Sequence, residues 1–525
     1  MDKTIHECYT GYMTLRNEMG HWLKQSMLLD PPGPNDGGED EANYALAWFP
    51  HYLITGDAAV LKHFDMLKTA LLGWVKRDCL HGYEPKAEAH HGPEPFLLFL
   101  PRYIGLVPED TEAVHLLTDA AEHIGNWVPE IPPWYDYDQD TFIGYNIGSR
   151  DVKNDEKDRY ELAEHFRFIH IALAAYRVTG EERYLTWALR YGTKRAERLI
   201  AAPDPMPLLW TLDGEGLDEA AVDAKNLHRL VASSHHIPND PLAGIEVLLA
   251  SGAIYALGDL YLLSGDEIFK TAAKRIVEPL VTSLSDPFND PAAAALSYYR
   301  WTFEDTCFDE AIRSGLADLP DAPPELLALV FPQENRRREP GVGKRADMAY
   351  WGEWSDDGSV KPIREPSTAT LTLAYQVTGE MTYAMRAIRS AATRLGMARR
   401  VLRGGREHAD MGGAVCSVAA GHGRNWGQGA VTACYGPLLL GTREVQGEVA
   451  QLLEIQRGNG NSHPPPNLLS LVRPIFAQQD GSAEVVFYNG GDASLTFSWR
   501  FRNGDETSPW HEETLAGHET QKRVL

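Results

Sequence analysis

Histidines and carboxylates stand close together at two places in this sequence of 525 residues. His91 belongs to one pair of adjacent histidines, and Glu94 follows that pair between two prolines. Helix capping does not readily account for a carboxylate in that position, so Glu94 is the first candidate for a catalytic acid or base. His236 belongs to a second pair, and Asp240 after it is either a helix cap or a second carboxylate. Cleavage of a glycosidic bond by hydrolysis needs two such carboxylates, one as acid and the other as base or nucleophile.

A polar and aromatic stretch, residues 134–159, suits a different reaction. Tyr145, Asn146 and Arg150 lie close together in it, and Asp155 follows them. β-Elimination at a uronate needs a base, often Tyr or His, and a group such as Asn, His or Arg that neutralises the carboxylate. The stretch therefore also fits a lyase, with the histidines above as alternative bases. Asp155 is either a further carboxylate for hydrolysis or a helix cap.

Two more stretches, 350–367 and 403–429, have the composition of a ligand-binding surface. Aromatic faces stack on a sugar ring, and charged groups or amides form hydrogen bonds with its hydroxyls. The glycines of the second stretch let the backbone approach a ligand closely. The candidate substrate-binding residues in the two stretches are Trp351, Arg364, His422, Arg424 and Trp426.

The elements that must position these residues form an internal repeat. The hairpin motif Tyr-x-x-[Ser/Thr]-Gly-[Asp/Glu] occurs four times, each time where an apolar helix ends and an amphipathic one begins. Glycine suits the left-handed residue that ends a helix, and an acid suits the start of the next one. Each pair is therefore expected to have a buried inner helix and an outer helix with one face in water. The motif occupies residues 52–57, 176–181, 261–266 and 375–380.

Two hairpins without the motif, 93–128 and 427–457, bring the pairs to six. The sequence thus predicts a mainly α fold, an (α/α)6 barrel. The motif leaves only a tight turn at one end of each pair, so the long polar stretches enter the inner helices together and line one mouth. The inner helices are expected to begin near Glu41, Pro95, Arg159, Leu242, Ser367 and Gly429.

The other segments extend this barrel. Residues 1–40 are predicted to be a helical segment that covers it, the barrel itself occupies 41–457, and 285–364 is an insertion. From 467 to 525 apolar and polar residues alternate, which predicts short strands in a small antiparallel β appendage.

Composition limits the partners. A net charge of −25 argues against nucleic acid, whose binding depends on clustered Lys and Arg. The apolar run 242–263 contains Glu246 and Asp259, so we interpret it as a buried helix rather than a membrane span. Five scattered cysteines and no visible signal peptide fit a cytoplasmic protein without a cysteine metal site. We expect no metal, no cofactor and an oligosaccharide substrate, and a homo-oligomer stays open.

On the hairpin repeat and the composition of its loops, residues 40–457 resemble the six-hairpin glycosidases and the (α/α)-toroid polysaccharide lyases of the heparinase II/III kind. The resemblance implies a carbohydrate-active enzyme. The first interpretation is a glycoside hydrolase acting on oligosaccharides, with a uronic acid held by Arg150 or Arg364. The alternative is a uronate lyase that uses His and Tyr. A sugar epimerase with paired histidines is third, and a carbohydrate-binding protein is the alternative without catalysis.

Overall fold

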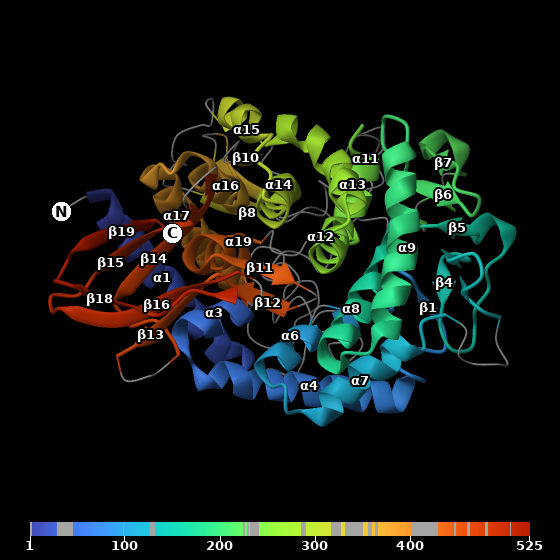
Figure 1. Cartoon of the computed structure of the whole chain (residues 1–525), viewed down its shortest axis with the longest axis horizontal. Coiled ribbons are helices and arrows are strands. Elements are labelled where there is room, and N and C mark those ends of the chain that lie inside the picture. The colour runs from blue at the N-terminus through green and yellow to red at the C-terminus, as the bar shows by residue number, and fades with distance from the viewer. Residues whose placement is uncertain are drawn as a thin grey trace.

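The chain is mainly helical, and its C-terminal part is built of antiparallel strands (Figure 1). The computed structural model describes residues 3–28, 46–97, 99–125, 132–223, 226–227, 230–231, 241–284, 290–316, 327–330, 350–354, 357, 360–362, 366–401, 429–445, 448–458, 462–477, 481–503 and 506–524.

All four hairpin motifs form the expected turn. In the copy at 176–181, Gly180 adopts a left-handed conformation (φ 70°) and its N–H donates to the carbonyl of Tyr176. Thr179 receives a hydrogen bond from the N–H of Glu181, which leads the chain into the next helix. The motif is therefore a local device for ending one helix and starting another. Its other glycines, Gly56, Gly265 and Gly379, have φ values of 62°, 68° and 74°.

The motif turns join four pairs of helices, and further helices follow the same order of a buried helix before an outer one. The inner ones are α3 (Trp48–Thr55), α5 (Glu94–Leu97), α6 (Phe99–Leu106), α8 (Arg167–Thr179), α11 (Ala243–Ala250), α12 (Ala253–Ser264), α16 (Thr368–Thr378) and α19 (Ala430–Cys434), which continues as the π-helical turn η7 (Tyr435–Leu440). The outer ones are α4 (Ala58–Asp78), α7 (Thr111–Glu122), α9 (Glu182–Ala201), α13 (Glu267–Val277) and α17 (Met381–Val401).

Most of the expected starts of inner helices are confirmed, but the start predicted near Arg159 is wrong. Residues 160–161 instead form strand β5, and a 3₁₀ turn at Ala163–Phe166 delays α8 to Arg167. The carboxylate of Glu161 accepts a hydrogen bond from Thr141 and pairs with Arg198, so it does not cap a helix. The expected start near Glu41 lies outside the described residues.

The apolar run 242–263 is buried, as expected, except near its end, where Leu262 is 38% exposed, and it forms two helices. Gly252, in a left-handed conformation (φ 74°), separates α11 from α12, which meet at 62°. Of the helices that the structure describes, none by itself has the length and apolar composition of a membrane span, and this bent pair alone meets those two criteria jointly.

The prediction that the hairpin 427–457 ends in an outer helix is wrong. The chain forms three strands there, β11 (Thr442–Val445), β12 (Glu448–Gln451) and β13 (Leu453–Arg457). Leu453 and Ile455 of β13 are both buried, and residues two apart share a face only in a strand. The N-terminal helix α1 (Lys3–Ser26) packs against α17 and α3.

The predicted insertion contributes a further helical pair. Helix α14 (Asp290–Thr302) packs between α12 and α16, and α15 (Asp309–Leu316) follows it. Contacts then run from α5 through α8, α12, α14, α16 and α19 to η7 and α3. Phe49 of α3 and Phe99 of α6, with ring centroids 6.2 Å apart, bring the series back to its start. Three short strands, β8 (Leu327–Val330), β9 (Tyr350–Trp354) and β10 (Val360–Pro362), form a small sheet after α15.

The C-terminal strands form two antiparallel sheets around a shared apolar core, one layer more than the sequence indicated. Phe487 in one sheet packs on Phe497 and Trp499 in the other, at centroid distances of 5.1 and 5.5 Å. The first sheet is β14 (Leu468–Ala477), β15 (Gly481–Asn489) and β19 (Thr520–Val524). The second contains β13, β16 (Leu495–Asn503), β17 (Glu506–Thr507) and β18 (His511–Leu515).

Candidate active site

The candidate active site lies where the chain enters α5, α8 and the break between α11 and α12. Glu94 is the first residue of α5, and its N–H donates to the carbonyl of His91. The N–H of Gly92, two residues before Glu94, donates to the carbonyl of Glu88. Gly92 is packed so closely that a Cβ there would lie 2.8 Å from the side chain of Ile147. This tight turn directs the Glu94 side chain into the protein interior, where it is 2% exposed.

Arg167, the first residue of α8, binds Glu94. Its Nη1 donates to Glu94 Oε1 at 2.6 Å and also to the carbonyl of His90. Its Nη2 donates to the carbonyl of Ala250, at the end of α11, at 3.3 Å. The guanidinium is 1% exposed, so a single buried cation joins the entrances of three inner helices.

Two buried glutamates at this site differ in charge. Burial alone raises the pKa of Glu94, but the Arg167 guanidinium and His91 outweigh burial and hold that pKa below its usual value. Burial raises the pKa of Glu164, in the turn before α8, to about 7. Arg167 lowers the pKa of Glu164 only in part, and Glu88 raises it further. At neutral pH one carboxyl is thus ionised and the other holds a proton for much of the time, a division typical of acid/base pairs.

Two histidines lie between these carboxylates. His90 Nδ1 is 3.9 Å from Glu164 Oε1, and His91 has Glu88 Oε1 at 3.4 Å on one side and Glu94 Oε2 at 3.8 Å on the other. Adjacent side chains point apart in a strand, but residues 89–93 form turns. The two rings therefore lie 4.3 Å apart at 75°. The side chain of His91 is 41% exposed and brings the cluster to the surface.

The same cluster has the spacing of a metal site, although its charge disfavours one. Ligand atoms of His90, His91 and Glu94 lie within 4.8 Å of one another. The Arg167 guanidinium already occupies Glu94 Oε1, and a second cation in this buried place would be repelled by it. The donor set is better suited to moving protons than to holding a metal.

The residues predicted in the loop 134–159 are divided between the site and the surface. Tyr145 is buried next to it, and its carbonyl accepts a hydrogen bond from Ala89 at 3.0 Å. The Asn146 side chain donates to the carbonyl of Lys153 and so closes its own loop. Arg150 and Asp155 are exposed, and Asp155 makes no side-chain cap.

Most aromatic residues of that loop pack in the core and present no face to a sugar. Trp134, Tyr135 and Phe142 are fully buried, and Phe142 stacks on His165 at 4.3 Å. These three rings therefore offer no stacking surface to a ligand.

Other candidates fall where the structure gives no side-chain contacts. Trp351 belongs to β9, but only the backbone of that strand is described. The candidates outside the described residues are His236, Asp240, Arg364, His422, Arg424 and Trp426.

Sequence reasoning missed Glu164 and Arg167, the partners of Glu94. A signal was present, because Glu164, His165, Arg167 and His170 interrupt a stretch that is otherwise apolar on every side. All four side chains are buried. A charged group in a buried stretch must be paired, so each of these positions predicts an interaction with a distant part of the chain.

Comparison with known proteins leaves the chain without a family. No family description matches the sequence, and no curated protein matches it. Among solved structures, cellobiose 2-epimerase from Bacillus thermoamylovorans B4167 is similar to part of the chain, with 11% sequence identity and a TM-score of 0.28. The similarity covers 49% of this chain and 77% of that one. A TM-score this low carries no conclusion about the reaction.

The Glu164 carboxyl is expected to make stability depend on pH. Because its folded pKa of about 7 exceeds the ordinary value of 4.5, its contribution is complete below pH 4.5 and is lost as the pH rises through 7. This loss of unfolding free energy amounts to about 3 kcal/mol. The loss is absent in Glu164→Gln, because glutamine does not ionise. Between pH 5 and pH 8, the free energy of unfolding measured by chemical denaturation should fall by about 1–3 kcal/mol more in the wild type than in the variant. Exposed Glu156→Gln is the control, and equal differences at both pH values for Glu164→Gln would contradict the expectation.

Proposed function

We propose that this chain is a carbohydrate-active enzyme, a glycoside hydrolase that works through Glu164 and Glu94 on an (α/α) barrel of helical hairpins. The observation that carries the proposal is the pair of buried glutamates with different charge beside one arginine. Hydrolysis of a glycosidic bond uses such a pair, since one carboxyl must give a proton while the other acts as an anion.

Glu164 is the general acid of this proposal. Burial keeps its proton in place up to a pH of about 7, close to the operating pH at which an acid catalyst is most effective. Both carboxyl oxygens of Glu164 are buried, and among the described residues no side chain donates a hydrogen bond to either of them. For Glu164 to protonate the oxygen of a leaving sugar, the side chains that cover it must move aside.

Glu94 is the anionic partner. Arg167 holds Oε1 and keeps the carboxylate ionised, so that Oε2, on the side of His91, is the atom that activates water or attacks the sugar. His91 reaches the surface and would contact the substrate first. The exposed Arg150 suits the carboxylate of a uronic acid. Trp351, Arg364, His422, Arg424 and Trp426 remain the further substrate-binding residues that the sequence predicts.

A second candidate reaction rests on His91. An imidazole between two carboxylates, with Glu88 at 3.4 Å and Glu94 at 3.8 Å, is placed as a proton-abstracting base would be. Such a base would serve β-elimination at a uronate or epimerisation of a sugar. Neither reaction requires the proton on Glu164.

The two proposals differ in their products. The test is to incubate the full chain with neutral and with uronate-containing oligosaccharides. Both the number of reducing ends and the absorbance of unsaturated uronates are then measured. Hydrolysis produces new reducing ends without absorbance. New absorbance that is lost in His91→Ala would contradict the hydrolase and establish the lyase. Conversion of one sugar into its epimer without new reducing ends would establish the epimerase.

If Glu164 is the acid, its neutral isostere removes the proton donor. Glu164→Gln is expected to lower kcat/KM by about 10²–10⁴-fold, the usual contribution of general acid catalysis. In the wild type, kcat/KM should fall as the pH rises through about 7, because Glu164 then loses its proton. The residual activity of the variant should lack this decline. Wild-type activity and the same pH profile in Glu164→Gln would remove this residue from the mechanism.

Glu94 must be tested against a matched buried ion pair, because removal of one partner from such a pair also costs stability. Glu161 provides the match, since it is fully buried and bound to Arg198. Both Glu94→Gln and Glu161→Gln are expected to unfold more easily, by about 3–5 kcal/mol. Well below both unfolding temperatures, only Glu94→Gln should lose turnover. Equal turnover in the two variants would assign Glu94 a structural role.

A further inference from the structure

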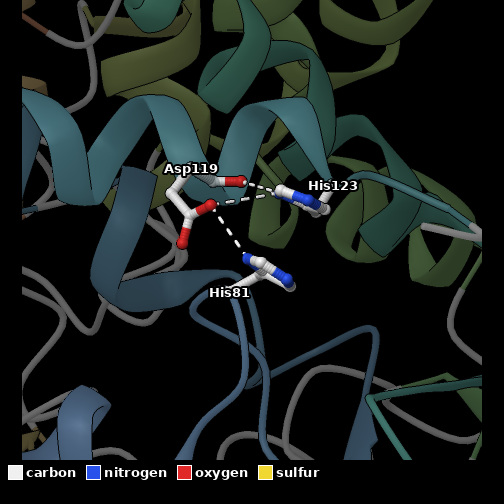
Figure 2. A group of neighbouring side chains, drawn as sticks. All are labelled: His81, Asp119 and His123. Carbon is white, nitrogen blue, oxygen red and sulfur yellow. Dashed lines mark hydrogen bonds and ion pairs between the residues drawn. The ribbon is translucent and has the colours of Figure 1, made fainter. Parts of the chain in front are cut away.

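Three potential metal ligands meet on the outer side of the first two hairpins, apart from the candidate active site. His81 lies in the turn after α4, while Asp119 lies in the last turn of α7 and His123 ends that helix. Figure 2 shows both imidazoles directed at the same carboxylate oxygen of Asp119. The rings are stacked, with centroids 3.6 Å apart and an angle of 10° between them.

The distances match those between ligands of a bound ion. Nδ1 of His81 is 2.9 Å from Asp119 Oδ1, and Nδ1 of His123 is 3.2 Å from the same oxygen. A tetrahedral zinc ion with bonds of about 2.0–2.1 Å holds its ligand atoms roughly 3.3 Å apart. All ligand atoms of the group lie within 4.8 Å of one another. Because the two rings are parallel, an ion between their Nδ1 atoms would lie in neither ring plane, so at least one imidazole must rotate to bind it.

The turn that carries His81 is held in place. His81 has a left-handed backbone (φ 53°), which is uncommon for any residue other than glycine. Leu80 and Tyr83 close the turn by two backbone hydrogen bonds, of 2.9 and 3.0 Å. The buried Tyr83 hydroxyl donates to the carbonyl of Ala120, next to Asp119 on α7. A strained conformation kept by such support is a reason to look for a function at that residue.

We propose that His81, Asp119 and His123 bind a divalent transition metal ion of the zinc class. Two imidazoles and one carboxylate are ligands that zinc accepts, with water in the fourth position. The three side chains are 35%, 28% and 20% exposed, which gives an ion and its water access from solvent. Each imidazole binds through Nδ1 and carries its proton on Nε2. The ion replaces the hydrogen bond between His81 Nδ1 and the Asp119 carboxylate, and the bond of His123 Nδ1 to the Asp119 backbone carbonyl at 2.7 Å.

Such an ion would connect two separate parts of the chain. His81 belongs to the segment that continues to Glu88, His90 and His91, whereas Asp119 and His123 belong to the outer helix α7. The ion would thus hold the segment leading to the candidate active site against the helical scaffold. This site does not depend on the proposed function, because none of its ligands takes part in the proposed reaction.

The test is a titration of the full chain, first stripped of metal with a chelator, with Zn²⁺ alone. Calorimetry should give one equivalent bound with a dissociation constant of about 1 µM or below. Co²⁺ in its place should give the visible absorption of a four-coordinate ion. His81→Ala and His123→Ala should each weaken binding by at least about 100-fold, since even outer partners of metal ligands contribute 10–100-fold.

Two controls keep the result decisive. His115→Ala removes an exposed histidine from the same helix and should bind as the wild type does. His91→Ala tests the other group with metal-ligand spacing and should also leave binding intact. Circular dichroism checks that each variant is folded, and Zn²⁺ should raise the unfolding temperature of the wild type but not of His81→Ala. The proposal is overturned if no equivalent binds, or if binding survives in His81→Ala and is lost in His91→Ala.

Discussion

The buried charge of Arg167 is the constraint on which the candidate site depends. Removing a guanidinium from water is costly unless hydrogen bonds and an opposite charge compensate it. Arg167 meets that need with Glu94 and with the carbonyls of His90 and Ala250. These partners lie 73, 77 and 83 residues away in the chain. One side chain thereby sets how the entrances of three inner helices lie relative to one another.

The same cation also gives the two glutamates different charges. Glu94 is bonded directly to Arg167 and stays ionised despite its burial. Glu164 has no bond to the guanidinium, so burial dominates and its proton is retained to a higher pH. Glu161, bound to Arg198 on the outer helix α9, shows that a buried glutamate–arginine pair by itself is a structural feature of this fold. The chemical difference at the site lies in the second, unbonded carboxyl.

The helical scaffold could be predicted where its signals are local. In the hairpin motif, Gly180 and Thr179 act within a few residues, so the turn forms wherever the motif occurs. The prediction was wrong where a longer-range contact decides. Residues 160–161 pair with β6 (Leu209–Thr211) and so form a strand before α8. Residues 453–457 pair with β16, and their alternating burial against that sheet replaces the helix.

The sequence by itself determined the turns of the four hairpin motifs and the acidic composition, and it singled out the turn with His91 and Glu94, because these depend on neighbouring residues and composition. Only the tertiary structure decided what those residues can do. Protonation depends on burial and on charges a few ångströms away, and Glu94 and Arg167 are 73 residues apart. The ligand group of His81 and Asp119, 38 residues apart, exists for the same reason. Packing of one hairpin on the next brings such residues together, and no local pattern encodes which of them will meet.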